Sequence, residues 1–555
     1  MQSTILKDVS PRLLWIFFLA CAIPLAFAAY TQHAWEDYYI TFRVSRNLAA
    51  GHGLVFNVGD RLHTFTSPLG VLVPALTSLL TRNSSDAAAL WLFRALCIAA
   101  FGLGSTLLFA AATRLRYPAL AAFLLVGLLI TDAKSVDFTI NGMETAFVLL
   151  GFAYAFWAMF GISSRAWLHL GVAWAFMMWS RPDSFVYIGL FAGAVLLFNQ
   201  PGVTRRTRCE WLQVFLRAAA VATLVYLPWF VFSWAYYGSP VPHTVIAKSM
   251  MAAPKTLATF WQFLRHPPVG TFVALFMPIY ATSFGGWPAD ILFTGKITAM
   301  ALSVAWVFPG LRTETKAASF TLLGSHFYLS YFTLQFPWYF CLPALLGFVT
   351  LSGLLAQAIS ATRKIPHRTV EVLKFFFVVV SLAVVLGGAW LTMQSAKQLK
   401  LQQAIIENGT RREIGLWLRE HAAPSDTVLL EPLGYIGYFS GLKTYNVPGL
   451  TSREVVEVER RFGVVWGAIA AELHPEWLVL RPQEIDSITR SHPRLLEEQY
   501  ERTREFNVTD QVASLAIYGR DYLDLDSIFT VFRRIKPLAN NISNEPPPRP
   551  PEKPK

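Results

Sequence analysis

Long apolar runs constrain this chain more than any other feature of its sequence. Runs of roughly 15 to 25 mostly apolar residues recur from Pro11 to about Thr392, and a helix of about 20 residues crosses a bilayer core. Of the 555 residues, 54% are hydrophobic and only 15% are charged, which excludes an ordinary soluble globular protein. Because backbone polar groups in lipid need partners within their own segment, we expect an all-α polytopic membrane bundle.

The basic residues set the expected topology. The net charge of +12 also fits nucleic-acid binders, but here the basic residues cluster in short loops between apolar runs. Such clusters indicate cytoplasmic loops and a lipid bilayer as partner, with no nucleic acid. The clusters are Lys7 and Arg12; Arg114 and Arg116; Arg205, Arg206 and Arg208; and Arg363, Lys364 and Arg368.

With these loops inside, the chain is expected to form about eleven transmembrane helices. The first run, 13–29, is taken as a retained helix, and the first outer loop spans 31–87 with a juxtamembrane helix at 67–80. Segment 271–309 holds two apolar pieces where a single crossing is needed, so its topology stays open. The other expected spans are 88–112, 117–131, 145–161, 166–180, 184–198, 211–234, 318–335, 338–360 and 371–393.

The character of the chain changes after residue 393. Charged residues become frequent, TRREIGLWLREHA has helical spacing, and DTVLLEPLGYIGYFSGL and PEWLVLRP are typical of strands with turns. We therefore divide the chain into a transmembrane module, 1–393, a soluble α/β domain, 394–540, and a disordered Pro-rich tail, 541–555. The topology places the soluble domain outside the cytoplasm.

Ionisable residues gather at the outer face. At the margin of a membrane such residues cost free energy unless they form ion pairs or have a function. Glu36 and Asp37 follow the first apolar run, and the later outer loops carry Glu144, Asp183 and Lys248. This set suits group transfer from a lipid phosphate: one carboxylate takes the proton of an attacking hydroxyl, a second orients the acceptor or holds a metal ion, and cations stabilise the departing phosphate. The alternative is that each acid pairs with a nearby arginine and caps a helix.

Five stretches match a known family in order and spacing across residues 10–360. They are WEDYYITFRVSRNLAAGHGLVFNVGDRLHTFTSPLG, INGMETAFVLL, SRPDS, YYGSPVPHTVIAKSM and QFPWYF. The chain resembles the C-type (GT-C) polyprenyl-phosphate-sugar-dependent membrane glycosyltransferases, most closely the branch of the mycobacterial terminal arabinofuranosyltransferases. The first stretch is the most specific, and the others are individually weak.

The resemblance implies roles for particular residues. The family's first outer loop bears an acidic pair, usually Asp-Asp, whose second member is regarded as the catalytic base, here Asp37. Glu36 replaces the first Asp and is one methylene longer, so its role as partner is open. Glu144 matches a second outer-loop acid, and His243 and Lys248 match a stretch where a cation meets the donor phosphate, although relatives often have Asn in place of His243.

Three further positions carry two interpretations each. Arg181 either binds the donor phosphate through its forked guanidinium or forms a simple pair with Asp183 at a helix end. Trp338 and Tyr339 either stack on a sugar or belong to an interfacial aromatic belt. Arg43, just after the acidic pair, is taken as a third substrate-binding residue. In the soluble domain, LGYIGYFSGLKTYNVPGL either binds the acceptor or forms part of the domain's core.

These observations predict a GT-C-like glycosyltransferase of the bacterial cytoplasmic membrane. It moves a sugar, with arabinofuranose as one candidate, from a polyprenyl phosphate donor to a cell-envelope glycan or lipid acceptor on the outer face. The sequence requires no cofactor and shows no metal site, although a divalent cation is compatible with the acidic pair. A secondary transporter and a non-catalytic envelope assembly protein are the alternatives, and a transporter would need discontinuous helices.

Overall fold

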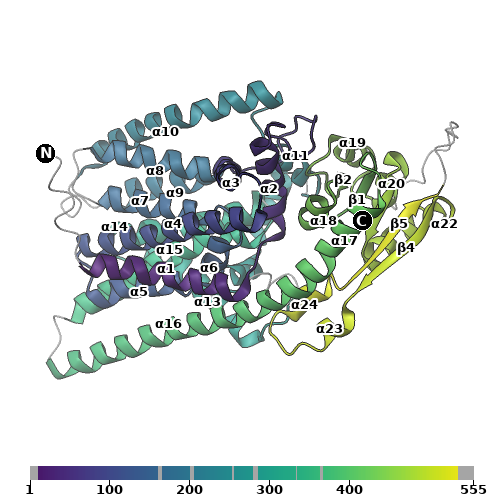
Figure 1. Cartoon of the computed structure of the whole chain (residues 1–555). Coiled ribbons are helices and arrows are strands. Elements are labelled where there is room, and N and C mark those ends of the chain that lie inside the picture. Colours follow the sequence, from purple (N-terminus) through teal and green to yellow (C-terminus); the bar gives the residue numbers. More distant parts are fainter. Residues whose placement is uncertain are drawn as a thin grey trace.

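The computed structural model describes residues 11–160, 165–199, 206–252, 255–278, 285–332, 334–362 and 367–535. A bundle of helices carries a smaller α/β domain at one end, and a long helix, α16, runs along the bundle into that domain (Figure 1). The tail expected at 541–555 lies outside the described residues, as do the basic residues Lys7, Arg205, Arg363 and Lys364.

The bundle consists of helices, and a long loop, 50–67, joins α2 to α3. Its elements are α1 (Pro11–Thr31), α2 (Glu36–Ala49), α3 (Pro68–Leu80), α4 (Asp86–Arg114), α5 (Ala119–Ile130), α6 (Ala133–Ile140), α7 (Thr145–Phe160), α8 (Ala166–Ser180), α9 (Ser184–Phe198), α10 (Arg208–Tyr237), α11 (His243–Met250), α12 (Leu257–Arg265), η1 (Val269–Leu275), α13 (Ala289–Val304), η2 (Ala305–Val307), α14 (Thr313–Phe332), η3 (Pro337–Phe340), α15 (Cys341–Ala361) and α16 (His367–Gln402).

Every span expected from the sequence corresponds to a helix, but the number that cross the membrane stays a prediction. Among the described residues, six helices are long and apolar enough to cross a bilayer, or seven if the bent pair α5 and α6 forms one span. The two members of that pair meet at 54°. In the uncertain region 271–309, α13 with η2 is long and apolar enough to cross, whereas η1 is a short 3-10 helix.

Local sequence signals account for several helix ends. The hydroxyl of Ser67 accepts a hydrogen bond from the Gly70 N–H at the start of α3, and Asp132 accepts one from Ser135 N–H (2.9 Å) at the start of α6. At the C-terminal end of α10, Gly238 adopts the left-handed conformation that glycine tolerates best. These caps fix where the outer connections begin and end.

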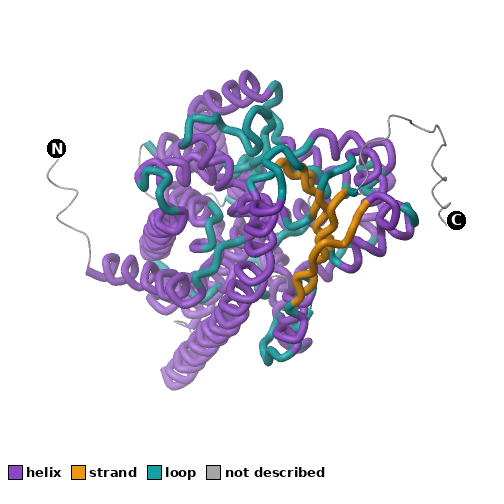
Figure 2. Tube along the Cα trace, turned by 45° about the vertical axis from the view of Figure 1, so that its right-hand side comes forward, coloured by secondary structure: helices purple, strands orange, loops and turns teal. Residues whose placement is uncertain are grey.

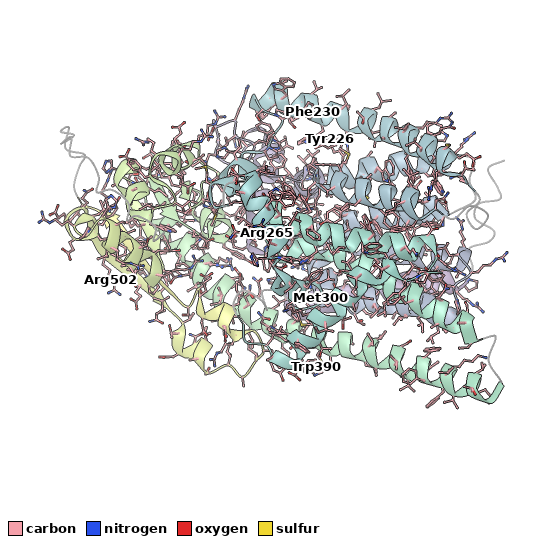
Figure 3. All side chains as sticks on the ribbon, turned by 180° about the vertical axis from the view of Figure 1, so that it is seen from behind. Tyr226, Phe230, Arg265, Met300, Trp390 and Arg502 are labelled. Atoms are coloured by element: carbon pink, nitrogen blue, oxygen red, sulfur yellow. The ribbon has the colours of Figure 1, made fainter. Side chains whose placement is uncertain are left out.

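The two ends of the bundle differ. The starts of α1, α10 and α16 lie at the end remote from the α/β domain, and α2, α3 and α11 lie beside that domain (Figure 1). Side chains such as those of Tyr226 and Phe230 on α10 and Trp390 on α16 lie along the outer walls of the bundle (Figure 3). The starts of α1 and α10 therefore lie at the end opposite the domain, and the side of the membrane that this end faces stays a prediction of the positive-inside rule.

The expected boundary at 393/394 falls within a continuous helix, and the division into domains stays a prediction. Helix α16 continues through a π-helical segment, η5 (Gln403–Arg412), into α17 (Glu413–His421). The change of composition at 394 indicates where the helix becomes polar, which need not be where the helix ends. A single rigid element thus connects the bundle to the domain.

The C-terminal domain is built on a five-stranded mixed sheet of order β2-β1-β3-β5-β4 (Figure 2). Strands β1, β2 and β3 are parallel, and β5 pairs antiparallel with both β3 and β4. The elements are β1 (Thr427–Leu430), α18 (Leu433–Ser440), β2 (Lys443–Asn446), α19 (Arg453–Phe462), α20 (Trp466–Leu473), β3 (Trp477–Leu480), α21 (Pro482–Ser491), α22 (Leu495–Gln499), β4 (Tyr500–Asn507), α23 (Thr509–Ala513), α24 (Arg520–Asp524) and β5 (Ile528–Arg534).

The expectation of an α/β domain is met, but one local assignment is wrong. PEWLVLRP contains β3 as expected, whereas LGYIGYFS forms helix α18 instead of a strand with turns. Short apolar runs do not distinguish helix from strand by periodicity alone. This segment becomes helical where it can pack against α2, and one hydrophobic cluster joins Ile40 and Val44 of α2 to Ile436 of α18.

Candidate active site

The acidic pair occupies the first turn of α2, where the helix dipole favours negative charge. The turn before it is held by Arg94 of α4, a nearly fully buried arginine. Its guanidinium donates to the carbonyl oxygens of His33 (2.5 Å) and Ile140 (2.7 Å). Glu36 and Asp37 are therefore presented on a rigid framework.

Burial raises the pKa of both acidic side chains above their ordinary values. For Glu36 the negative charge of neighbouring Asp37 adds to the effect. For Asp37 the positive charge of Lys248 opposes it, and a hydrogen bond from Glu36 also lowers the pKa. Because a general base works best when its pKa lies near the operating pH, a raised pKa suits Asp37 to accept a proton.

Lys248 reaches this region from α11. It lies in the last turn of that helix, where the dipole favours a cation. Its ammonium nitrogen lies 4.6 Å from the ring centre of Phe336 and 5.9 Å from that of Trp338. Lys248 is close enough to act electrostatically on Asp37, which lies more than 200 residues earlier in the chain.

Glu144 and Arg181 form a second group beside it. The Arg181 guanidinium donates hydrogen bonds to the Asp183 carboxylate from Nε (3.1 Å) and Nη2 (3.2 Å). Its Nη1 lies 3.5 Å from the buried Glu144 carboxylate. The guanidinium carbon also lies 4.5 Å from the ring centre of Tyr339. The helix-end pair of Arg181 and Asp183 therefore exists, and it is linked to Glu144.

Arg181, Asp183, Trp338 and Tyr339 line a cavity of about 20 Å³. This volume holds about one water molecule, so a phosphate group fits only after Arg181 or Tyr339 moves. Tyr339 is half-buried against the guanidinium. Trp338 is only 7% exposed and stacks on Phe336 (4.7 Å between ring centres), so it acts in packing instead of offering a free face to a sugar.

Two predicted site residues lie elsewhere. The Arg43 guanidinium donates to the carbonyl oxygens of Gly437 (2.7 Å), Gly441 (3.2 Å) and Leu442 (3.1 Å), so it holds the end of α18, and its predicted contact with substrate stays a prediction. The His243 ring lies against the carbonyl oxygens of Gly449 (3.0 Å) and Ser452 (3.2 Å) in the C-terminal domain. Neither contact is local in sequence, so residue type alone could not reveal these structural roles.

Other residues near the site were given no role by sequence reasoning. His33 Nδ1 lies 2.9 Å from Asp137, and both side chains are fully buried. From the C-terminal domain, the charge of Glu431 acts on both Glu36 and Asp37. Arg94 carried a usable signal, since a charged residue within an apolar helix indicates a function or a buried partner. Glu431 carried none.

Within the described residues, no three His, Cys, Asp or Glu side chains are grouped so as to hold a metal ion. The cluster that is present consists of a carboxyl group with a raised pKa, Asp37, a neighbouring carboxyl group, and two cations on other elements. Such a set can accept a proton and stabilise a leaving group that carries negative charge.

Comparisons with known proteins match part of the chain to characterised enzymes. The chain is 27% identical over 281 residues to a terminal beta-(1->2)-arabinofuranosyltransferase of Corynebacterium glutamicum, covering 46% of this chain and 39% of that protein. It is 28% identical over 262 residues to the enzyme of the same description from Mycobacterium tuberculosis, covering 42% and 38%. The matched region is thus less than half the length of either relative. The resemblance to terminal arabinofuranosyltransferases is confirmed.

The whole fold has a solved counterpart. The crystal structure of ArnT from Cupriavidus metallidurans bound to undecaprenyl phosphate matches 96% of this chain and 100% of that chain, with a TM-score of 0.52 and 14% identity. At this identity the likeness concerns the fold alone. Residues 399–524 also match a domain of unknown function (DUF8728), which begins inside the long helix and covers most of the C-terminal domain.

Proposed function

We propose that this chain is a membrane glycosyltransferase that transfers arabinofuranose from a polyprenyl phosphate donor to a cell-envelope glycan or lipid on the outer face of the cytoplasmic membrane. The observation that carries the proposal is the meeting of Asp37, Lys248 and the Glu144–Arg181 pair at the end of the bundle that bears the C-terminal domain. The similarity to two terminal arabinofuranosyltransferases supports the sugar, and the fold shared with a protein crystallised with undecaprenyl phosphate supports the donor.

In the proposed reaction, Asp37 removes the proton from an acceptor hydroxyl as its oxygen attacks the anomeric carbon of the donor sugar. The bond from that carbon to the phosphate oxygen breaks, and polyprenyl phosphate leaves with the electron pair. Arg181 and Lys248 stabilise the negative charge on the departing phosphate. Glu36 and Glu144 act as electrostatic partners that hold Asp37 and Arg181 in place.

The bundle also offers space for an apolar chain. A cavity of about 320 Å³ lies between α5, α13, α15 and α16, and its lining is mostly apolar, including Leu128, Phe348 and Leu391. Asp132 at this cavity is close enough to act electrostatically on Cys341, which lines the small cavity beside Arg181. We propose that part of the polyprenyl chain occupies the larger cavity while its phosphate reaches Arg181.

Sugar transfer by purified protein tests the function. The assay supplies radiolabelled polyprenyl phosphate sugars, with the arabinofuranose form among them, and a synthetic oligo-arabinofuranoside acceptor. Removal of a general base by Asp37→Asn is expected to lower kcat by at least about 100-fold. The matched control is Asp60→Asn, in the same outer loop, which should transfer sugar at the parent rate.

The outcomes separate the candidate functions. Transfer by the parent protein that Asp37→Asn abolishes supports both the enzyme class and the base, and the active donor identifies the sugar. If the Asp37→Asn variant transfers sugar as fast as the parent protein, Asp37 is not the general base. If folded parent protein transfers no sugar from any donor to native membrane extract, the glycosyltransferase proposal fails, and solute flux in proteoliposomes would then indicate a transporter.

A further inference from the structure

The first turn of α18 touches the acidic pair directly. The backbone N–H of Gly434 donates a hydrogen bond to Oε1 of Glu36. A Cβ atom at Gly434 would overlap the main-chain carbonyl oxygen of Glu36 and would lie 2.7 Å from its Oε1. Any residue larger than glycine must therefore displace either α18 or the start of α2.

Two other groups from the same part of the chain hold Ala34, two residues before Glu36. The side-chain oxygen of Gln403, in η5, accepts a hydrogen bond from the Ala34 N–H (2.9 Å). The hydroxyl of Tyr435, in α18, donates to the Ala34 carbonyl oxygen (3.0 Å), and Gln403 donates to that hydroxyl (3.0 Å). Residues 34–36 are thus anchored by side chains and backbone that lie more than 360 residues later.

Charged groups of the same region surround the pair. Arg411 of η5 exerts an attractive charge on both Glu36 and Asp37, and Glu431, just before α18, exerts a repulsive one. Arg411 is itself fixed by Glu407 (2.8 Å) and by Asp526. The C-terminal domain therefore contributes both contacts and charge to the acidic pair.

From these contacts we propose that α18 is a positioning element of the active site, in which Gly434 holds the Glu36 carboxyl so that Asp37 faces the acceptor hydroxyl. This inference rests on the proposed function and gives a role to part of the domain of unknown function. The Glu36 side chain is long enough to accept the hydrogen bond from the Gly434 amide, and we expect a side chain one methylene shorter to lose it.

The test is steady-state transfer by full-length purified variants, with polyprenyl phosphate arabinofuranose as donor and an oligo-arabinofuranoside as acceptor. Gly434→Ala should lower kcat at least about tenfold while the donor KM stays within about twofold, because misplacement of the base affects the chemical step. Gly437→Ala is the matched control, one turn later in α18. Its added Cβ would meet nothing nearer than the Thr444 hydroxyl at 3.2 Å, and it should keep the parent kcat.

Two substitutions of Glu36 keep the test valid if Gly434→Ala fails to fold. Glu36→Gln keeps the length and an oxygen that accepts from Gly434, whereas Glu36→Asp keeps the carboxylate but shortens the side chain. Positioning predicts a kcat at least about fivefold higher for Glu36→Gln than for Glu36→Asp. The double variant Glu36→Asp, Gly434→Ala should be no slower than the slower single variant, because both changes break the same contact.

The results distinguish failure of the positioning role of Gly434 from failure of the proposed glycosyltransferase function. Active parent protein with an equally active Gly434→Ala variant overturns the positioning role, as does Glu36→Asp exceeding Glu36→Gln in kcat. A rise in donor KM at constant kcat in Gly434→Ala also overturns it, since that pattern indicates lost donor binding. Parent protein that transfers no sugar refutes the proposed function instead.

Discussion

The buried carboxylate of Asp526 offers the sharpest test of how the C-terminal domain is held together. Its two oxygens bind two arginines from different elements, Arg411 of η5 and Arg481 at the end of β3 (2.5 Å), and its side chain is 3% exposed. Asp526→Asn keeps the shape of the side chain but removes the charge that compensates both guanidinium groups. The variant should therefore fold less stably.

The magnitude follows from what the arginines retain. Removing one partner of a buried ion pair costs about 3–5 kcal/mol. Here Arg411 keeps Glu407 (2.8 Å), and Arg481 keeps Glu431 (2.7 Å) and Glu484 (2.7 Å), so we expect the lower end, about 3 kcal/mol. At about 3 °C per kcal/mol for a domain of this size, Tm should fall by about 10 °C.

The pH dependence has a definite sign. Burial alone would raise the pKa of Asp526, but Arg411 and Arg481 lower it below the ordinary value of 3.8. A depressed carboxyl pKa stabilises the folded state above the pKa of the unfolded side chain, and this contribution is lost as the pH falls through the folded pKa. The difference in Tm between parent and Asp526→Asn should therefore be full at pH 7 and shrink in strong acid.

Thermal unfolding in detergent micelles, followed by tryptophan fluorescence, measures the effect, because Trp477 lies buried in the domain. Asp524→Asn is the matched control. Asp524 is 3.8 Å from Arg520 and nearly half-exposed, so its loss should cost at most about 1 kcal/mol. Equal Tm values for the two variants at pH 7 would refute the reasoning from burial and pairing.

Three further outcomes are expected. Arg181→Lys keeps the charge but loses the forked geometry, so kcat/KM should fall about 10- to 100-fold; donor titrations measure this, and parent-like kinetics would contradict it. Arg43→Ala removes three hydrogen bonds to carbonyl oxygens, so thermal unfolding should show a loss of about 2–3 kcal/mol in the free energy of unfolding, with an unchanged donor KM. A raised KM would instead support the prediction that Arg43 binds substrate. Among described residues both Glu459 carboxylate oxygens lack a hydrogen-bond partner, and burial raises the pKa of Glu459 to about 7. The folded state therefore loses stability as the pH rises from 4.5 through 7, and Glu459→Gln should gain about 1–3 kcal/mol at pH 8 but little at pH 5, whereas exposed Glu457→Gln should change neither.

The apolar spans and the acidic turn were predictable because both depend on local sequence. Helices α1, α4 and α10 lie where long apolar runs stand, since a run of about 20 apolar residues suffices for a span whatever lies around it. The position of Asp37 at the start of α2 likewise follows from the end of the first run. The same local reasoning placed a domain boundary at 394, because it detects polarity and not helix continuity.

Contacts between distant segments decided the rest. Arg43 and His243 carry the residue types of a binding site, yet the structure uses both to hold the C-terminal domain, through carbonyl oxygens that no sequence pattern marks. The sequence by itself determined a membrane bundle with an acidic turn at one end and the identity of its relatives. Only the tertiary structure brought Lys248 to Asp37 and Gly434 to Glu36, because each pairing depends on packing between elements hundreds of residues apart.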